Sequence, residues 1–178
     1  LADFERQLPD HDLVILSDYG KGGLTHITQM IDMAKAAGKR VLVDPKGDDY
    51  ARYAGASLLT PNRSELREVI GKWESEADLK TKADALRDKL NLEALLLTRS
   101  EEGMSLFRPE GVFNQAAKAR EVFDVSGAGD TVIATLALML ASGADYPEAV
   151  RVANLAASIV VGKLGTAVVT RDELQQAL

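Results

Sequence analysis

Short apolar runs alternate with amphipathic stretches along most of the chain, and this alternation constrains the fold more than any other feature. The apolar runs have the length of buried β-strands and cover residues 13–16, 41–43, 57–59 and 94–97. The stretches between them carry apolar residues at helical spacing and cover residues 25–38, 61–70 and 77–90. Alternating strands and helices predict an α/β fold, with a mostly parallel sheet covered by helices on both faces. Ligands are then expected at the carboxyl edge of the strands.

The rest of the chain predicts a hairpin followed by helices. Residues 104–107 and 112–116 flank a turn at residues 109–111, which is typical of an antiparallel pair at a sheet edge. Helical patterns then occupy residues 131–140, 147–161 and 171–178. No linker or internal repeat interrupts the pattern, so we expect one domain over residues 1–178.

Composition excludes several classes of function. The net charge is −6, the wrong sign for a protein that neutralises nucleic-acid phosphates over a broad surface. The chain has no cysteine and only two histidines, which excludes disulfides, thiolate nucleophiles and Cys- or His-rich metal sites. The longest strongly apolar stretch, residues 131–141, is too short to span a bilayer. We therefore expect a cytoplasmic protein with no nucleic-acid or membrane partner, whose metal, if it binds one, lies on carboxylates and phosphate.

The sharpest motif is DVSGAGD at residues 124–130, which runs directly into an apolar helix. Gly127 and Gly129 let the backbone approach a ligand, and the N–H groups at a helix start form an anion site. Asp130 lies beside that site, where a carboxylate could take a proton from a hydroxyl while the amides hold a transferring phosphoryl group.

The spacing of the residues in this motif does not by itself decide between a catalytic loop and other structures. A Gly-rich turn whose Asp130 only caps the helix fits the same residues. The motif is not a Walker A loop, because no Gly-Lys-Ser/Thr follows. It also does not follow a first strand, as a dinucleotide-binding fingerprint would.

Two further polar clusters follow predicted strands. Asn62 and Glu65 share a face at a helix start, where an amide can touch phosphate and a carboxylate can hold hydrated Mg²⁺. A capping box explains the same pair equally well. Thr98, Ser100 and Gly103 follow the strand at residues 94–97 and carry little weight alone.

Together, these motifs resemble the C-terminal two thirds of the ribokinase (PfkB) family of carbohydrate kinases. The resemblance implies a ribokinase-like fold and an ATP- and Mg²⁺-dependent sugar kinase. It implies that Asp130 is the general base, that the amides of Gly127, Ala128 and Gly129 form the anion hole, and that Asp124 belongs to the same motif on the substrate side. It implies nucleotide-binding roles for Asn62, Arg63, Ser64, Glu65, Thr98, Ser100, Gly103, Asn154 and Gly165, with Glu65 holding Mg²⁺ through water.

Within that family, residues 16–22, 43–47, 97–106 and 161–166 are similar to the kinases that phosphorylate heptose 7-phosphate at C1 in lipopolysaccharide core synthesis. This similarity implies that Asp18, Lys21 and Lys46 face the anionic substrate. Solvated loop lysines explain Lys21 and Lys46 equally well. It also implies a homodimer in the longer protein and fusion to an adenylyltransferase domain.

The chain also departs from the family pattern. The family's N-terminal part, with its sugar-contacting residues and its small β-sheet lid, has no counterpart in the sequence, and the chain begins at Leu1, so we expect a preceding segment. Val125 replaces the usual threonine, so its carbonyl would have to serve a monovalent cation. Three alternatives follow: a kinase for another sugar, an inactive nucleotide-binding fragment, or an α/β domain with neither activity.

Overall fold

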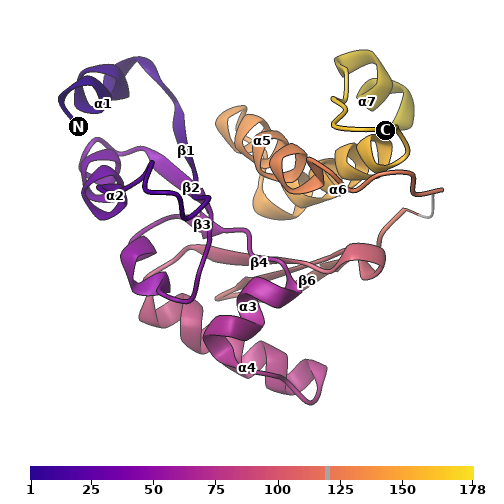
Figure 1. Cartoon of the computed structure of the whole chain (residues 1–178), viewed down its shortest axis with the longest axis horizontal. Helices are drawn as coiled ribbons and strands as arrows, with labels where there is room; N and C mark the ends of the chain where they lie inside the picture. Colours follow the sequence, from indigo (N-terminus) through magenta and orange to yellow (C-terminus); the bar gives the residue numbers. More distant parts are fainter. Residues whose placement is uncertain (119–120) are drawn as a thin grey trace. The chain divides into compact units, whose positions relative to one another are not determined.

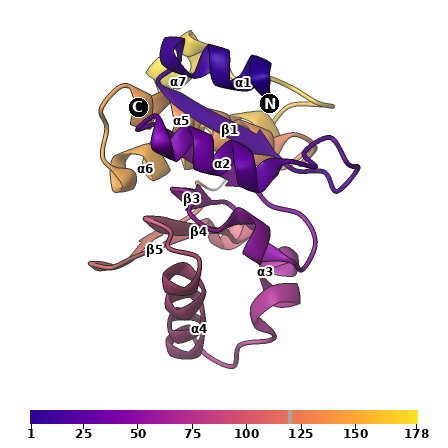
Figure 2. The same ribbon diagram turned by 90° about the vertical axis from the view of Figure 1, so that its left-hand side faces the viewer.

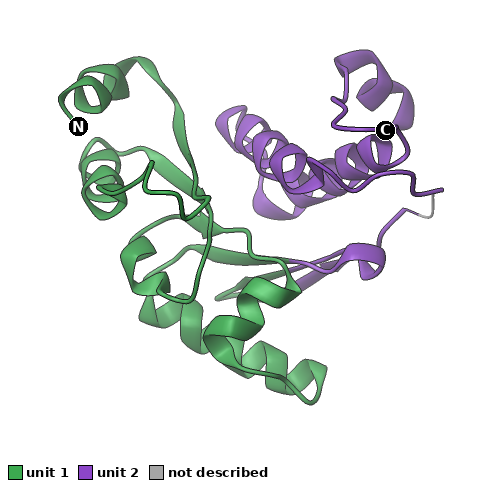
Figure 3. Cartoon of the chain, in the orientation of Figure 1, with its two compact units in different colours: residues 1–97, 106–112 green, residues 98–105, 113–178 purple. Residues whose placement is uncertain are grey.

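The computed structural model describes residues 1–118 and 121–178, which form two compact units (Figure 3). The first unit comprises Leu1–Leu97 and Leu106–Val112, and the second comprises Thr98–Ser105 and Phe113–Leu178. Each unit is described by itself below. The expectation of one domain over residues 1–178 stays a prediction.

Six strands form one sheet in the order β1-β2-β3-β4-β5-β6. The strands are β1 (Leu13–Ser17), β2 (Arg40–Asp44), β3 (Leu58–Leu59), β4 (Ala94–Thr98), β5 (Met104–Arg108) and β6 (Gly111–Gln115). The first four strands pair in parallel, with Val14 opposite Val41 and Leu58 opposite Ala94. The two-residue connection between β5 and β6 allows only an antiparallel hairpin. The prediction of a mostly parallel α/β sheet is therefore confirmed.

The central strands are apolar on both faces because both faces are buried. Val41 and Val43 belong to the main core of the first unit, while Leu42 between them points to the opposite face and is also fully buried. This is the pattern that continuous apolar runs predict. β1 lies at the end of the strand order, and its Ile15 is 41% exposed.

The helices of the first unit pack around this core. They are α1 (Ala2–Gln7), η1 (Leu8–Asp10), α2 (Ile27–Ala36), η2 (Tyr50–Tyr53), α3 (Arg63–Ile70) and α4 (Glu76–Lys89), where η marks a 3₁₀-helix. Helix α2 packs against β2 (Figures 1 and 2). It begins two residues later than predicted, because the Thr25 hydroxyl donates to the Gly22 carbonyl in a turn instead.

The second unit is built on two long helices. Its helical elements are η3 (Ser100–Glu102), α5 (Ala128–Ala141), α6 (Tyr146–Val161) and α7 (Arg171–Ala177). Helices α5 and α6 pack against each other and bury Leu136 and Val150. The predicted start of α5 at residue 131 is wrong by three residues, because the left-handed Gly127 serves as the N-cap and the next residues are already helical.

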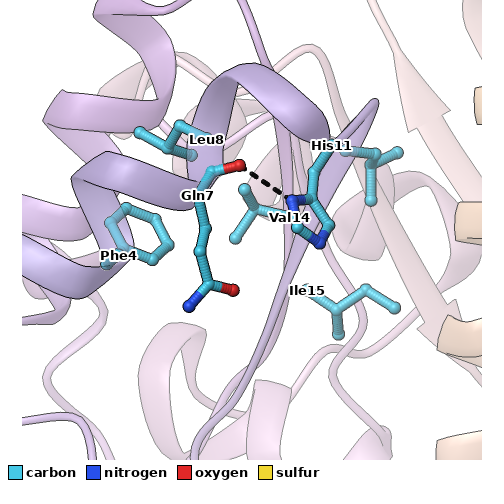
Figure 4. Close-up of a pocket in the computed structure, with 7 residues that line it drawn as sticks. Phe4, Gln7, Leu8, His11, Val14 and Ile15 are labelled. Atoms are coloured by element: carbon cyan, nitrogen blue, oxygen red, sulfur yellow. Dashed lines mark hydrogen bonds between the residues drawn. The ribbon is translucent and has the colours of Figure 1, made fainter.

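A cavity of about 420 Å³ lies beside β1 in the first unit (Figure 4). Its lining is mostly apolar and comprises Phe4, Gln7, Leu8, His11, Leu13, Val14 and Ile15. The His11 ring nitrogen Nδ1 lies 2.8 Å from the Gln7 carbonyl oxygen (Figure 4). The lining has no carboxylate, lysine or arginine, so this cavity does not match the phosphate chemistry that the motifs predict. Among the described helices, none combines the length and the hydropathy that crossing a bilayer needs.

Candidate active site

Gly127 shapes the loop that leads into α5. Its φ of 77° is left-handed, a conformation that glycine adopts without steric cost. Its carbonyl accepts the N–H of Thr131 at 3.0 Å and the Thr131 hydroxyl at 2.9 Å, which closes the first turn. The helix therefore starts at Ala128. The Ala128 N–H donates to the Val125 carbonyl at 3.2 Å, and the positive end of the helix dipole at this N-terminus favours an anion.

Asp130 lies in the first turn of α5, and its side chain is exposed. The N-cap position belongs to Gly127, three residues earlier, so Asp130 is not the N-cap residue of this helix. Gly129 faces open space, because a Cβ atom built on it meets nothing within 4 Å. A carboxylate thus lies next to an accessible helix N-terminus, as the kinase interpretation requires.

Asp124 holds this loop from the other side. Its Oδ1 accepts the Ser126 N–H at 2.8 Å. The N–H and hydroxyl of Ser126, and to a smaller extent the N–H of Gly165, hold the pKa of the Asp124 carboxyl below its usual range. A Cβ built on Gly127 would lie 3.4 Å from Cγ2 of Thr166. The structure therefore brings together two predicted motifs, residues 124–130 and residues 161–166, through the contacts of Gly127 with Thr166 and of Asp124 with Gly165.

The segment after β4 owes its conformation to backbone contacts. The Arg99 N–H donates to the Gly103 carbonyl at 2.8 Å, and Ser100 has a left-handed φ of 52°. A Cβ on Gly103 would lie 2.0 Å from the Gln115 carbonyl oxygen, so only glycine fits there. Close packing against the backbone is therefore a sufficient reason for a glycine at position 103, and no ligand is needed to explain it. Ser100 is exposed and Thr98 is half-buried. Their nucleotide-binding roles stay predictions.

Asn154 is buried within the second unit. Its side-chain amide donates to the Ala116 carbonyl at 2.9 Å, and only 6% of the residue is exposed. The structure therefore gives Asn154 a role in holding the segment that follows β6. Its predicted contact with the nucleotide stays a prediction.

Asp18 is the most buried acidic residue of the first unit, with 4% of its side chain exposed. Its Oδ1 accepts the Gly20 N–H at 2.8 Å, and its Oδ2 accepts the Tyr53 hydroxyl at 2.8 Å. An Arg52 guanidinium nitrogen lies 3.6 Å from the same Oδ2. Lys21, in the same loop, is exposed.

Asn62 and Glu65 were predicted to form either a phosphate and Mg²⁺ site or a capping box, and the structure contains the capping box. Asn62 Oδ1 accepts the Glu65 N–H at 3.0 Å, and Glu65 Oε2 accepts the Asn62 N–H at 2.9 Å. Arg63 and Ser64 occupy the first two positions of α3. The other Glu65 oxygen lies 3.3 Å from Lys46 Nζ. The structure thus places Lys46 and Glu65 together, although they were expected to serve different ligands, the substrate anion and Mg²⁺.

Tyr53 and Arg52 are partners of Asp18 that were not predicted from the sequence. The sequence offered only a general indication of this contact, because the hydroxyl of any buried tyrosine usually has a hydrogen-bond partner. The partner itself, Asp18, lies 35 residues away in the sequence.

The chain's own residues fit a Mg²⁺ ion held mostly by phosphate and water. No group of three or more His, Asp or Glu side chains that could hold a metal occurs within residues 1–118 and 121–178. Mg²⁺ in nucleotide sites typically keeps several waters and uses one or two carboxylates together with phosphate oxygens. Glu65 alone, with one oxygen in the capping box and one at Lys46, suits a contact through water.

Comparison with known proteins agrees with this chemistry. The pfkB family carbohydrate kinases match residues 13–172. The chain is 57% identical over 173 residues to a D-beta-D-heptose 7-phosphate kinase of Bordetella bronchiseptica, covering 97% of this chain and 55% of that one. It is 54% identical to the bifunctional protein HldE of Chromohalobacter salexigens, covering 98% of this chain and 37% of that one. The chain thus spans between about a third and just over half of these relatives.

A solved structure gives the same fold. Arabidopsis thaliana ribokinase, complexed with ribose and ATP, superposes with a TM-score of 0.87 at 24% identity, covering 99% of this chain and 59% of that one. Escherichia coli phosphofructokinase-2, in complex with potassium, superposes with a TM-score of 0.82 at 21% identity, covering 99% and 60%. The fold is therefore ribokinase-like, and the match over residues 13–172 shows that this chain belongs to the pfkB family of carbohydrate kinases.

Proposed function

We propose that this chain carries the general base and the phosphate-binding loop of an ATP-dependent sugar kinase, with D-glycero-β-D-manno-heptose 7-phosphate as acceptor. The observation that carries the proposal is the position of Asp130, in the first turn of α5, three residues after the left-handed Gly127 that caps this helix. The acceptor is inferred from 57% identity to a protein named as a heptose 7-phosphate kinase. The products would be the 1,7-bisphosphate and ADP.

Asp130 would take the proton of the anomeric hydroxyl. The C1 oxygen then forms a bond to the γ-phosphorus, and the bond between that phosphorus and the bridging oxygen of ADP breaks, so the electron pair leaves with ADP. The amides of Gly127, Ala128 and Gly129 would hold the charge on the transferring group, and the Ala128 N–H would have to exchange its 3.2 Å bond to the Val125 carbonyl for this contact. The open space in front of Gly129 leaves room for it.

ATP and Mg²⁺ are the proposed cofactors. Mg²⁺ bound to the nucleotide would neutralise charge on its phosphates, and Glu65 is the residue that would hold the ion through water. We assign the nucleotide contacts to the residues named from the family resemblance: Asn62, Arg63, Ser64, Thr98, Ser100, Gly103, Asn154 and Gly165. A monovalent cation would use the carbonyl of Val125, which accepts the Ala128 N–H at 3.2 Å and keeps a second lone pair.

The acceptor's phosphate would be bound by Lys21 and Lys46, while Asp18 and Asp124 serve the substrate side. We further propose that the natural protein is longer, forms a homodimer and carries an adenylyltransferase domain. The relatives named bifunctional protein HldE, of which this chain covers 37%, support the longer form.

The test uses the natural full-length protein with ATP and heptose 7-phosphate, and compares Asp130→Asn with Asp145→Asn. Asp145 is the N-cap of α6 in the same unit, and asparagine caps a helix as well as aspartate does. Asp130→Asn should lower kcat by about 10²–10⁴-fold with little change in ATP affinity, while Asp145→Asn should leave kcat unchanged. Near-normal turnover of Asp130→Asn would refute the role of the base.

Two other results would replace the proposal. If ATP binds but no sugar is phosphorylated, the chain belongs to a nucleotide-binding protein without kinase activity. If a different sugar or sugar phosphate is turned over faster than heptose 7-phosphate, the kinase chemistry stands and the acceptor is wrong.

A further inference from the structure

We infer that Tyr53 is a positioning residue for the acceptor side of this kinase. Its hydroxyl joins the Asp18 carboxylate to the backbone of Lys46, and so fixes the two loops that carry Lys21 and Lys46. The inference rests on the proposed function, because those two lysines are the groups proposed to bind an anionic sugar phosphate.

The Tyr53 hydroxyl is the centre of a buried three-way contact. Tyr53 is fully buried, and its oxygen lies 2.8 Å from Asp18 Oδ2 and 3.0 Å from the Lys46 carbonyl oxygen. The Lys46 N–H donates to the same hydroxyl oxygen at 3.1 Å. A phenol has one proton, and the charged carboxylate is the stronger and nearer acceptor. Tyr53 thus donates to Asp18 and accepts from Lys46.

The Tyr53 hydroxyl keeps its proton at ordinary pH. Burial, together with the hydrogen bond to Asp18, raises the pKa of Tyr53 to about 12, although the hydrogen bond from the Lys46 N–H opposes this rise. The hydroxyl therefore remains a donor throughout the pH range in which a kinase is assayed.

Asp18 links the Tyr53 hydroxyl to the loop that follows β1. Burying a carboxylate is costly unless it is hydrogen-bonded or paired, and Asp18 has the Gly20 N–H, the Tyr53 hydroxyl and the Arg52 guanidinium as partners. Arg52 also donates to the Leu24 carbonyl at 3.1 Å. The loop that contains Lys21 is therefore held at Asp18, Gly20 and Leu24.

The same contact sets the position of Lys46. A Cβ built on Gly20 would lie 3.6 Å from Cγ of Lys46, so the two loops pack together. The Lys46 side chain is 54% exposed, and its ammonium lies beside Glu65. Losing the Tyr53 hydroxyl would free the Lys46 backbone while leaving the ammonium and its charge in place.

The neighbouring Tyr50 provides a matched control. It belongs to the same 3₁₀-helix, is 2% exposed, and packs edge-on against Tyr53 with ring centroids 5.5 Å apart. Its buried hydroxyl has no hydrogen-bond partner within the described parts of the chain. Tyr50→Phe therefore removes a buried hydroxyl without removing a link.

The experiment compares Tyr53→Phe and Tyr50→Phe in the natural full-length protein by steady-state kinetics with ATP and heptose 7-phosphate. Tyr53→Phe should raise the KM for the sugar phosphate by about tenfold, the effect of losing one hydrogen bond to a charged group. The KM for ATP should stay unchanged, and Tyr50→Phe should change neither. Equal effects of the two variants, or a change in both KM values, would overturn the inference.

Amide hydrogen exchange gives a second readout that does not depend on turnover. In Tyr53→Phe the Lys46 and Gly20 amides should exchange at least about tenfold faster, while in Tyr50→Phe they should keep their protection. If the unmodified protein phosphorylates no sugar, the proposed function fails, and exchange still decides whether the Tyr53 link exists. Unchanged protection in Tyr53→Phe would refute it.

A further variant covers the case in which Tyr53→Phe does not fold. Asp18→Asn keeps an acceptor for the Tyr53 hydroxyl and removes only the charge that strengthens this bond and attracts Arg52. It should also speed exchange of the Gly20 and Lys46 amides. Exchange at the normal rate would count against the link.

Discussion

Lys46 Nζ lies 3.3 Å from one oxygen of Glu65, while the other oxygen of the same carboxylate accepts the Asn62 N–H at 2.9 Å. Glu65 therefore completes the capping box of α3 and meets a loop cation at the same time. The two functions differ in what they need from the side chain. Capping needs only an acceptor oxygen, whereas holding a cation or its water shell needs the charge.

Glu65→Gln separates these two functions. Glutamine can still complete the capping box, so the free energy of unfolding should change by less than about 1 kcal/mol. The Mg²⁺ concentration that gives half-maximal kinase activity should rise by about tenfold, because the water bound to the ion would donate to a neutral amide oxygen instead of a charged carboxylate. A Mg²⁺ titration of activity, together with urea unfolding, measures both quantities.

Glu68→Gln is the control for this variant, because Glu68 is exposed on the same helix and is not part of the capping box. It should change neither stability nor the Mg²⁺ requirement. If Glu65→Gln also keeps the normal Mg²⁺ midpoint, Glu65 does not serve the metal.

Gly103→Ala should destabilise the second unit more than Gly143→Ala does. Both glycines have positive φ values, 91° and 93°, a backbone conformation that strains alanine by about 1–3 kcal/mol at either position. Only at Gly103 does the new Cβ meet backbone, 2.0 Å from the Gln115 carbonyl oxygen, which adds about 1–3 kcal/mol. Urea unfolding of the two variants measures the difference. Equal losses would mean that the backbone near Gln115 moves aside without cost.

The parallel core could be predicted because its signal is local. β2 was predicted at residues 41–43 and extends from Arg40 to Asp44, since a buried central strand is a continuous apolar run whose position does not depend on its partners. The capping box at Asn62 and Glu65 was equally accessible, because both residues lie within one helical turn.

The start of α5 could not be located in the same way. Small residues at 124–129 are typical of a loop, and nothing in their identity shows where helical geometry begins. The left-handed Gly127 sets that point, so the helix begins at Ala128 and includes Gly129. Asp130 was expected at or just inside the helix start, and it lies in the first helical turn.

The hydrogen-bond partners of buried polar side chains could not be predicted from the sequence either. Asp18 meets Tyr53 across 35 residues, and Asn154 meets Ala116 across 38. Such pairs depend on how whole elements pack, which periodicity and spacing do not encode. The family resemblance implies ligand contacts for Asp18 and Asn154, and the structure shows that their side chains also hold the fold.

The last prediction concerns pH and helix α7. The ammonium of Lys163 donates to Glu173 at 2.8 Å, and the Thr170 N–H and hydroxyl donate to the same oxygen. Together they hold the pKa of the Glu173 carboxyl at about 2, below its ordinary value of 4.5. Since the folded protein favours the ionised form, these contacts stabilise it fully above pH 4.5, and the stabilisation fades as the pH falls towards 2.

Glu173→Gln removes the charge and keeps a residue that suits the capping box of α7. The unmodified protein should have the higher Tm at pH 6, and its advantage over Glu173→Gln should shrink between pH 4.5 and pH 2, because Glu173 becomes protonated there. Thermal unfolding followed by circular dichroism at several pH values measures this difference. Asp172 is the exposed neighbouring acid in the same turn, and the difference in Tm between the unmodified protein and Asp172→Asn should not shrink in this way as the pH falls. A difference in Tm that stays constant from pH 6 to pH 2 would show that Glu173 contributes no ionised contact to the fold.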